Sequence, residues 1–324
     1  MITFNNVTKT FEDGTKAVDN VSFTVNEGNL VTLIGPSGCG KTTTMKMINK
    51  LISITSGKIT INGNDIAHED DVELRRNIGY VIQRIGLLPH MTIEDNVALV
   101  PKLKGWKKSE YLKKVDDLLD MVGLEPNIYK KRYPLELSGG QQQRIGVIRA
   151  LAGEPPIILM DEPFSALDPI SREQLQDELK LLQKNIHKTI VFVTHDMDEA
   201  LKIADEIVVM KEGGIEQIAT PSQLLQHPAN NFVESFIGED RAKRAIVSGE
   251  TRKANAIMQQ LPSTLETSNM HVVTQDTAIQ EVARVMLLKN TDTIIVTNST
   301  GAPTGLIEKN QLLQELAGIK EEVQ

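Results

Sequence analysis

The stretch Gly35-Pro36-Ser37-Gly38-Cys39-Gly40-Lys41-Thr42-Thr43 decides the fold of this chain of 324 residues. The apolar run Leu30–Ile34 before it is typical of a buried strand, and a helical pattern from Thr43 to Lys50 follows it. This is the context that the phosphate-binding pattern G-x-x-x-x-G-K-[ST] requires. The glycines let successive N–H groups point at phosphate oxygens, and the helix N-terminus adds partial positive charge. We expect Lys41 to reach the β- and γ-phosphates and Thr42 to ligate Mg²⁺. The alternative is a glycine-rich turn without a ligand.

Composition and charge narrow the class of protein. The length allows a large core and two domains. The net charge of −8 argues against a nucleic-acid partner, because such a partner needs an excess of Lys and Arg on one face. The longest apolar runs, such as Ile157–Met160, are far shorter than the roughly 18 residues of a membrane span, and no secretory signal is visible. The single cysteine, Cys39, excludes an internal disulfide and fits a reducing cytosol.

Polar residues follow several further strand patterns. Gln83 ends the run that begins at Ile78, Asp161 and Glu162 end the run that begins at Ile157, and His195 follows the run that begins at Thr189. Ligands bind at the carboxyl ends of strands in open α/β sheets. An Asp in this position is the Mg²⁺-associated Walker B partner of a phosphate loop, and the next residue, Glu162, can polarise a water. Structural salt bridges are the alternative for both acids, and a surface role is the alternative for His195.

Two more features have an ordinary and a functional interpretation. Ser138-Gly139-Gly140-Gln141 opens a helical stretch that runs to Leu151, so Ser138 fits a helix N-cap, and the exposed N–H groups form a second end that favours anions. Taken alone, this is only a good cap. Phe11 precedes the turn Asp13-Gly14 between two short antiparallel strands, where its ring either stacks on a purine or packs in the core or at its rim.

These motifs occur in one order within residues 1–238: Gly35 to Thr42, Leu137 to Gln141, Asp161-Glu162, Ser165 to Asp168, and His195. In this combination the chain resembles the ATP-binding subunit of an ABC transporter. The resemblance implies an α/β fold of the P-loop NTPase type, with a mixed core sheet, an antiparallel β subdomain and a helical subdomain. It also implies ATP and Mg²⁺ as cofactors, and a second copy of the chain that packs head to tail and sandwiches two ATP molecules.

The resemblance implies a role for each motif. Glu162 is expected to be the general base, His195 to contact the γ-phosphate, and Gln83 to sense Mg²⁺ and the attacking water. Thr42, Gln83 and Asp161 are the residues expected at the metal. The residues expected at the nucleotide are Phe11, Gly35, Pro36, Ser37, Gly38, Cys39, Gly40, Lys41, Thr42, Thr43, Ser138, Gly139, Gly140, Gln141 and Asp168. Ser138 and Gly140 would act on the ATP of the other copy, Asp168 would couple the two sites, and Phe11 would stack on adenine.

Residues 239–324 are expected to form a linker and a second domain. After the charged stretch 239–244, a β-α-β-β pattern and a last helix follow: Val272–Thr274, Ala278–Leu288, Thr293–Thr297, Gly305–Ile307 and Gln311–Leu316. This pattern is similar to one CBS motif, a small α+β module that acts in pairs and often binds adenosine compounds. The partner motif comes either from the other copy or from a degenerate repeat in residues 241–270. Glu308 and Asn310 depart from the family pattern, so a small regulatory ligand and a purely dimerising role both stay open.

An ABC ATPase with a CBS-like tail resembles importers of quaternary amines such as glycine betaine, carnitine or choline. Residues 78–83 and 88–92 are also similar to that group. The resemblance implies integral membrane permease subunits as separate partners, a solute-binding protein as an indirect one, and a location on the cytoplasmic face of the cell membrane. An importer of another small solute is one alternative, and a soluble ABC ATPase acting on ribosomes or DNA is a second. A regulatory protein with decayed catalysis is a third, opposed by intact Lys41 and Glu162.

Overall fold

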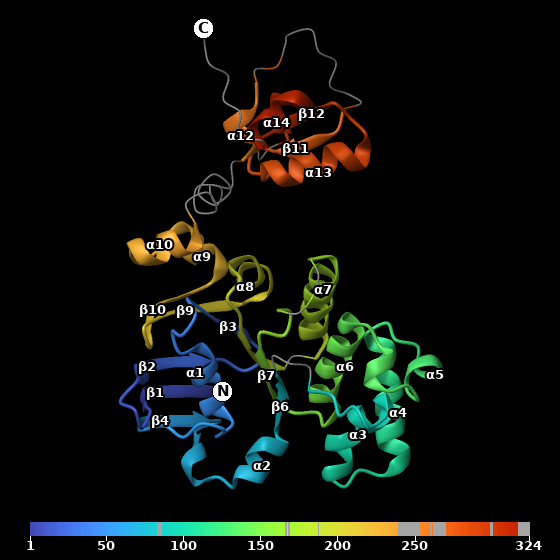
Figure 1. Cartoon of the computed structure of the whole chain (residues 1–324). Helices are drawn as coiled ribbons and strands as arrows, with labels where there is room; N and C mark the ends of the chain where they lie inside the picture. The colour runs from blue at the N-terminus through green and yellow to red at the C-terminus, as the bar shows by residue number, and fades with distance from the viewer. Residues whose placement is uncertain are drawn as a thin grey trace. The chain divides into compact units, whose positions relative to one another are not determined.

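The computed structural model describes residues 1–82, 86–165, 167, 169–186, 188–238, 253–259, 261, 270–298 and 301–316. The chain forms two compact units, Met1–Ile237 and Gly238–Gln324 (Figure 1). Three expectations fall outside the described residues: Gln83, Asp168, and most of the stretch 241–270 in which a degenerate repeat was considered.

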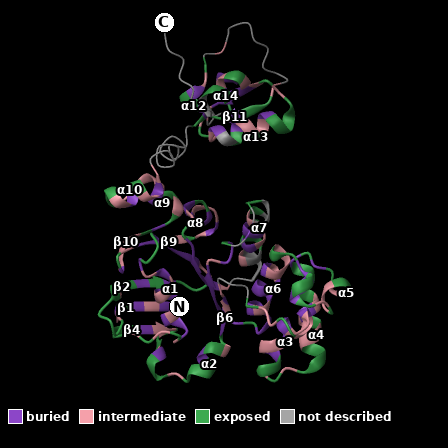
Figure 2. Cartoon of the chain, in the orientation of Figure 1, coloured by how far each residue is buried: buried purple, intermediate pink, exposed green. Residues whose placement is uncertain are grey.

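A six-stranded sheet forms the centre of the first unit, in the order β10-β9-β3-β8-β7-β6. Its strands are β3 (Leu30–Ile34), β6 (Ile78–Val81), β7 (Ile157–Asp161), β8 (Thr189–Val193), β9 (Glu206–Lys211) and β10 (Gly214–Ala219). The strands from β9 to β6 pair in parallel, and only β10 pairs antiparallel, with β9. Strands β3, β7 and β8 are buried along their whole length, which explains their continuous apolar sequences (Figure 2).

Alternate residues of β7 point to opposite faces of this sheet, as the period of a strand requires. Ile157 and Leu159 belong to the hydrophobic cluster that contains α1 (Lys41–Ile48), whereas Ile158 and Met160 belong to the cluster on the other face. Asp161 continues the first set and therefore faces α1. The strand's periodicity thus directs this carboxylate toward the helix that follows the phosphate loop.

The face that carries α1 is covered by a four-stranded antiparallel sheet in the order β2-β1-β4-β5 (Figure 1). Its strands are β1 (Ile2–Thr10), β2 (Lys16–Val25), β4 (Ser56–Ile61) and β5 (Asn64–Asp65). The turn between β4 and β5 is the expected Asn62-Gly63 pair, and both residues have positive φ, 53° and 84°. Helix α2 (Asp71–Arg76) then leads into β6.

The opposite face is covered by a helical part that packs on α7 (Pro169–Ile186) and on the strands. Its helices are α3 (Ile93–Leu103), α4 (Lys108–Met121), α5 (Pro126–Tyr129) and α6 (Gly139–Ala152). Three shorter helices complete the unit beside β9 and β10: α8 (Met197–Ile203), α9 (Pro221–Gln226) and α10 (Asn231–Ile237). The expected α/β fold, with its mixed core sheet, antiparallel β part and helical part, is confirmed.

The second unit contains a three-stranded sheet in the order β11-β12-β13. Its described elements are α12 (Ala254–Ile257), β11 (Val272–Thr274), α13 (Ile279–Lys289), β12 (Thr293–Thr297), β13 (Pro303–Glu308) and α14 (Lys309–Leu316). Strand β11 pairs in parallel with β12, and β12 pairs antiparallel with β13. The expected β-α-β-β order and the last helix are therefore present.

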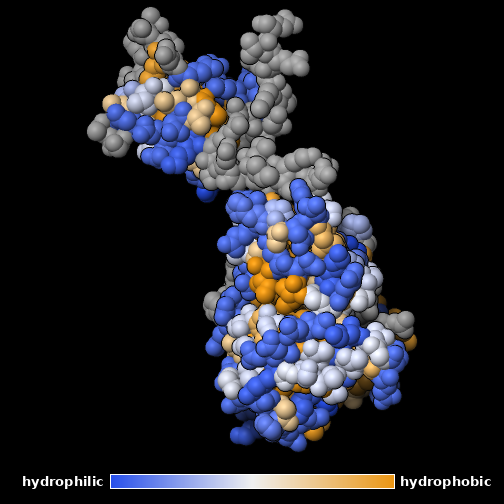
Figure 3. Space-filling model, turned by 90° about the vertical axis from the view of Figure 1, so that its left-hand side faces the viewer, coloured by the Kyte–Doolittle hydropathy of each residue, from blue (hydrophilic) through white to orange (hydrophobic). Residues whose placement is uncertain are grey.

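The surface of the first unit is largely hydrophilic on the face that Figure 3 shows, with one compact hydrophobic area. Within the described part of the chain, we find no helix with the length and apolar character needed to cross a membrane.

Candidate functional site

The predicted site residues follow neighbouring strands of the central sheet. The phosphate loop follows β3, Glu162 follows β7, and His195 comes shortly after β8, which lies between these two strands. All three strands run parallel, so their carboxyl ends meet at one edge of the sheet. The topology therefore brings together residues that are far apart in the sequence.

The phosphate loop has the backbone that its glycines allow. Gly40 has φ 103°, and a Cβ atom there would lie 2.3 Å from the Ala17 carbonyl oxygen. Gly35 lies equally close to the backbone of Met210, because a Cβ atom added at Gly35 would be 2.1 Å from the Met210 carbonyl oxygen. The Lys41 side chain is 6% exposed, and its ammonium group donates hydrogen bonds to the carbonyls of Gly35 (2.7 Å) and Pro36 (2.9 Å). The loop thus holds a positive charge at its centre.

Thr42 and Asp161 are in direct contact. The Thr42 hydroxyl donates a hydrogen bond of 2.8 Å to Oδ1 of Asp161, whose side chain is almost fully buried. Burial raises the pKa of Asp161, although the Thr42 hydrogen bond and the charges of Lys46 and Lys41 oppose this rise. The carboxylate is therefore ionised at a cost and gains from a nearby cation.

Tyr80 on β6 was not predicted as a site residue, yet it is half-buried and close enough to Asp161 for that carboxylate to affect its pKa. Burial raises the pKa of Tyr80, and the negative charge of Asp161 raises it further. The phenol stays a neutral donor beside the acid. The sequence alone does not mark Tyr80, because a tyrosine within a strand is as compatible with packing as with a site.

Thr42 and Asp161 suit Mg²⁺. This ion is usually bound through one or two carboxylates together with the phosphates of a substrate, rather than by a cage made only of protein groups. The described residues contain no cluster of three or more His, Cys, Asp and Glu side chains that could hold a metal alone. A hydroxyl and an ionised, nearly buried carboxylate beside a phosphate loop fit a metal that arrives with a nucleotide.

Glu162 and His195 also form a pair. Nδ1 of His195 lies 3.2 Å from Oε1 of Glu162, and the histidine side chain is 62% exposed whereas that of Glu162 is 19% exposed. Glu162 has φ 44°, which is unusual for a residue other than glycine. Its N–H donates to the Val193 carbonyl and its own carbonyl accepts from the Ser165 hydroxyl, so the backbone is held on both sides. The pair combines a largely buried carboxylate on a hydrogen-bonded backbone with an imidazole that reaches solvent.

Ser138 caps α6 as predicted, but this end of the helix belongs to the helical part of the unit and not to the sheet edge with the phosphate loop. Oγ of Ser138 accepts from the Gln141 N–H, and the Gln141 side chain accepts from the Ser138 N–H, which completes a capping box. Ser138 and Gly139 are exposed. Helix α6 packs on α3, α4 and β6, whereas α1 packs on β2, β7 and β8. Among the described residues, no hydrogen bond joins Ser138–Gln141 to the phosphate loop.

Phe11 is available for stacking. Its ring is 40% exposed, at the turn that leads into β2, and Nζ of Lys9 lies 5.2 Å from the ring centroid. Strand β2 reaches the phosphate loop at Ala17, next to Gly40. A buried core position for Phe11 is wrong, whereas a position at the rim of the core agrees with this exposure as well as stacking does.

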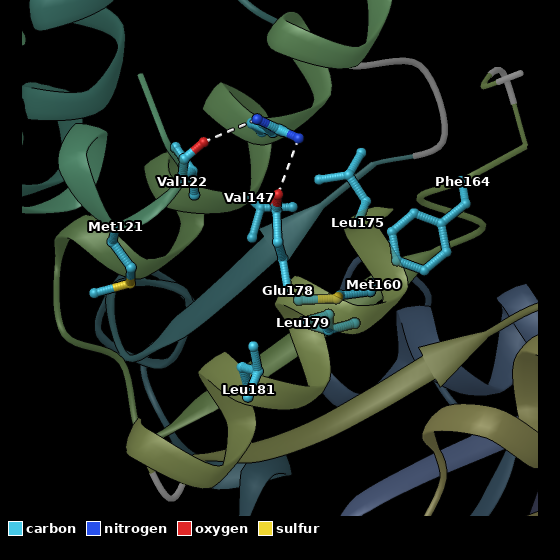
Figure 4. Close-up of a pocket in the computed structure, with 10 residues that line it drawn as sticks. Met121, Val122, Val147, Met160, Phe164, Leu175, Glu178, Leu179 and Leu181 are labelled. Atoms are coloured by element: carbon cyan, nitrogen blue, oxygen red, sulfur yellow. Dashed lines mark hydrogen bonds and ion pairs between the residues drawn. The ribbon is translucent and has the colours of Figure 1, made fainter. Parts of the chain in front are cut away.

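A separate cavity of about 260 Å³ lies between the end of α4, α6 and α7 (Figure 4). Its walls are apolar apart from Arg144 and Glu178, which pair at 2.9 Å, and Arg144 also donates to the Val122 carbonyl. Burial raises the pKa of Glu178, and Arg144 opposes this rise. No phosphate-loop residue and neither strand-end acid lines the cavity, so it is distinct from the site at the sheet edge.

Comparison with known proteins agrees with this geometry. The family described as "ABC transporter" matches residues 18–165. The choline transport ATP-binding protein OpuBA of Bacillus subtilis (strain 168) is 52% identical over 308 residues, which are 95% of this chain and 78% of that protein. The glycine betaine/carnitine/choline transport ATP-binding protein OpuCA of the same organism is 48% identical over 314 residues, 97% of this chain and 80% of that protein.

A solved structure is similar as well. The dimeric structure of a post-hydrolysis state of the ATP-binding cassette MJ0796, bound to ADP and Pi, has a TM-score of 0.62 and 37% sequence identity, and the match covers 68% of this chain and 99% of that one. The resemblance that the motifs suggested is confirmed. This chain belongs to the family of ABC transporter ATP-binding proteins, and it is an ATPase of that family.

Proposed function

We propose that this chain hydrolyses ATP to drive the import of a quaternary amine of the glycine betaine, carnitine or choline type through a separate membrane permease. It works as a head-to-tail dimer on the cytoplasmic face of the membrane, and a solute-binding protein delivers the solute to the permease. The names of OpuBA and OpuCA support the cargo, and the dimeric cassette structure supports the assembly.

One observation supports the proposal: the two sets of residues expected at the nucleotide lie on different elements of the unit, and no hydrogen bond among the described residues joins them. One set is at the sheet edge with Lys41, Asp161 and Glu162, and the other is at the exposed end of α6 at Ser138. A second copy, packed head to tail, brings the α6 end of one chain to the phosphate loop of the other. The N-terminus of α6 then meets an anion, as its partial positive charge favours.

Each set of residues has a task in phosphoryl transfer to water. Residues 35–43 cradle the phosphates, and Lys41 exchanges its loop carbonyls for phosphate oxygens. Thr42, Gln83 and Asp161 are the residues that would hold Mg²⁺, which would neutralise phosphate charge when bound. Glu162 accepts a proton from the attacking water, and His195 orients the γ-phosphate beside it. Phe11 stacks on adenine, while Asp168 couples the two sites.

The second unit is proposed to be a CBS-like regulatory or dimerising domain. Its parallel β11 and β12 joined through α13, followed by β13 and α14, support this assignment. A purely dimerising role is favoured by Glu308 at the end of β13, because this carboxylate would repel a phosphate.

The test of the hydrolytic role is the substitution Glu162→Gln in the complex with the permease. Removal of the general base is expected to lower ATP turnover by roughly 10²-fold or more while ATP binding is retained, so the dimer is trapped with ATP. The matched control is Glu154→Gln, since Glu154 also has positive φ (53°) but pairs with Lys114, away from the sheet edge. Turnover by E162Q equal to that of E154Q would contradict the assignment.

The test of the cargo uses the same complex in proteoliposomes. ATP-dependent uptake of labelled glycine betaine, carnitine and choline is measured against an uncharged sugar and a neutral amino acid as controls. Uptake of at least one quaternary amine is expected, and it should be lost in E162Q. Uptake of only a control solute would reject the cargo but leave the ATPase assignment intact.

A further inference from the structure

We propose that Arg172 is a positioning residue for ATP hydrolysis, which fixes the segment carrying His195 against the segment that leads into α7. This inference rests on the roles proposed above for Glu162 and His195. Arg172 is in the first turns of α7, and nothing in the family motifs considered above assigns a role to it.

The Arg172 guanidinium joins segments that follow two different strands. Nη2 donates a hydrogen bond of 3.3 Å to the Leu167 carbonyl, one residue before Asp168. Nη1 lies 3.5 Å from Oδ2 of Asp196, one residue after His195. One side chain therefore links the chain beside the residue proposed to couple the two sites with the chain beside the residue proposed to contact the γ-phosphate.

A third contact anchors this link in the fold. Nε of Arg172 lies 3.7 Å from Oε1 of Glu199 on α8, a side chain that is only 6% exposed. The other oxygen of Glu199 accepts a hydrogen bond of 2.6 Å from the Thr194 hydroxyl, and Thr194 directly precedes His195. The Asp196 N–H in turn donates to Oγ1 of Thr194. His195 thus lies between two residues that are each tied, directly or through Glu199, to Arg172.

The same residues line a small polar pocket with the proposed catalytic pair. Glu162, Ser165, Arg172, Thr194, His195, Asp196 and Glu199 enclose about 30 Å³. A polar space of this size is large enough for a water molecule. A shift of Arg172 would therefore move the wall of the pocket that contains Glu162 and His195, rather than a distant part of the unit.

The geometry explains why arginine suits this position. A guanidinium group spreads its charge over a rigid plane of donors, so Arg172 can donate a hydrogen bond to the Leu167 carbonyl and keep its charge within ion-pair distance of two carboxylates. A lysine ammonium is a point charge and would preserve attraction to Asp196 or Glu199 without fixing all three partners. Small displacements of reacting groups are costly, since a shift of about 1 Å can lower a rate roughly 10²-fold.

The experiment compares Arg172→Gln and Arg172→Lys in the full complex with the permease. We expect R172Q to lower kcat for ATP roughly tenfold, about 1.4 kcal/mol in the barrier, with less than about a twofold change in KM for ATP. R172K should lower kcat severalfold while its thermal unfolding midpoint stays close to that of the unchanged protein. The control is Lys180→Gln, which removes a cation from the same helix. The Lys180 ammonium donates to the Lys202 carbonyl.

The outcomes separate the inference from the function on which it rests. If R172Q and R172K have the same kinetics as K180Q, the positioning role of Arg172 is overturned. An inactive E162Q would in that case still support Glu162 as the general base. A loss of kcat that accompanies an equal rise in KM and a lowered unfolding midpoint would also overturn it, because this is the pattern of general destabilisation. Normal turnover by E162Q would instead reject the proposed base, and with it the pair that Arg172 is inferred to position.

Discussion

Asp161 shows at the residue scale how function opposes stability. Its carboxylate is almost fully buried, and burial raises its pKa above the ordinary value of 3.8. A carboxyl group with a raised pKa favours folding below its ordinary pKa, and this contribution is lost as the pH rises through the raised value. At neutral pH the ionised Asp161 therefore lowers the stability of the nucleotide-free fold, and a bound cation would offset this cost.

We predict that Asp161→Asn stabilises the nucleotide-free protein and abolishes its response to Mg²⁺. Asparagine keeps an oxygen for the Thr42 hydroxyl and removes the buried charge, so the free energy of unfolding should rise by roughly 0.5–2 kcal/mol near pH 7. Urea unfolding without nucleotide, and thermal unfolding with ATP and with or without Mg²⁺, measure the two effects.

The control for this prediction is Asp116→Asn, which removes an acid paired with Lys130 at the surface of the helical part. It should leave the Mg²⁺ response unchanged and should not stabilise the protein. The pH dependence gives a second check, because protonation of Asp161 begins at a higher pH than for an ordinary aspartate. The advantage of D161N over the unchanged protein should therefore shrink on acidification, and an advantage that grows would contradict the argument.

The sequence predicted the residues of this site that carry a motif, and the structure adds residues that carry none. Thr42 and Asp161 could be paired in advance because the motifs fix both the strand ends and their chemistry. Tyr80 and Arg172 escaped prediction for a physical reason. Each acts through a contact between elements, and neither a strand tyrosine nor a helical arginine has a local pattern that distinguishes it from a packing or surface residue.

At the scale of elements, the end of α6 combines a structural and a proposed functional task in one hydroxyl. The Ser138 oxygen accepts from the Gln141 N–H, so its own hydrogen is available as a donor to an anion at the exposed helix end. The same fold contains a capping box without that second task. Thr220 caps α9, where its hydroxyl accepts from the Gln223 N–H and the Gln223 side chain accepts from the Thr220 N–H.

We therefore predict that Ser138→Ala and Thr220→Ala have similar effects on stability and different effects on activity. Each loses a helix cap, which typically costs about 1 kcal/mol. Only S138A should lower ATP turnover, by roughly tenfold or more, because it also loses a donor to the γ-phosphate. Urea unfolding of both variants and steady-state ATP hydrolysis of both complexes make the comparison. Equal turnover by the two variants would reduce Ser138 to an ordinary cap.

Elements were easier to predict from the sequence than their arrangement. Continuous apolar runs marked β3, β7 and β8 correctly, since strands covered on both faces need no polar alternation. Nothing local in those runs states that β8 lies between β3 and β7. The strand order follows from long-range pairing, which neither the periodicity nor the motif resemblance supplied in advance.

At the scale of the whole molecule, the proposed dimer predicts a result that is not expected if each site lies within a single chain. Lys41→Ala removes the charge at the centre of the phosphate loop, and Gly139→Asp places a carboxylate at the exposed end of α6. A Cβ atom at Gly139 meets nothing within 4 Å, so the second substitution changes charge without crowding the fold. Each variant alone has two defective sites in a head-to-tail dimer and should be inactive.

Mixing the two variants should restore activity. In a mixed dimer, the intact phosphate loop of the Gly139→Asp chain meets the intact α6 end of the Lys41→Ala chain, while both defects fall in the other site. Random pairing makes half of the dimers mixed, so roughly one quarter of the unchanged ATPase activity is expected from sites that act independently, and less from sites that act together. Different affinity tags on the two chains verify that mixed dimers form. Mixed dimers without any activity above that of the separate variants would contradict the shared site, because a site contained within one chain gains nothing from a partner that carries the complementary defect.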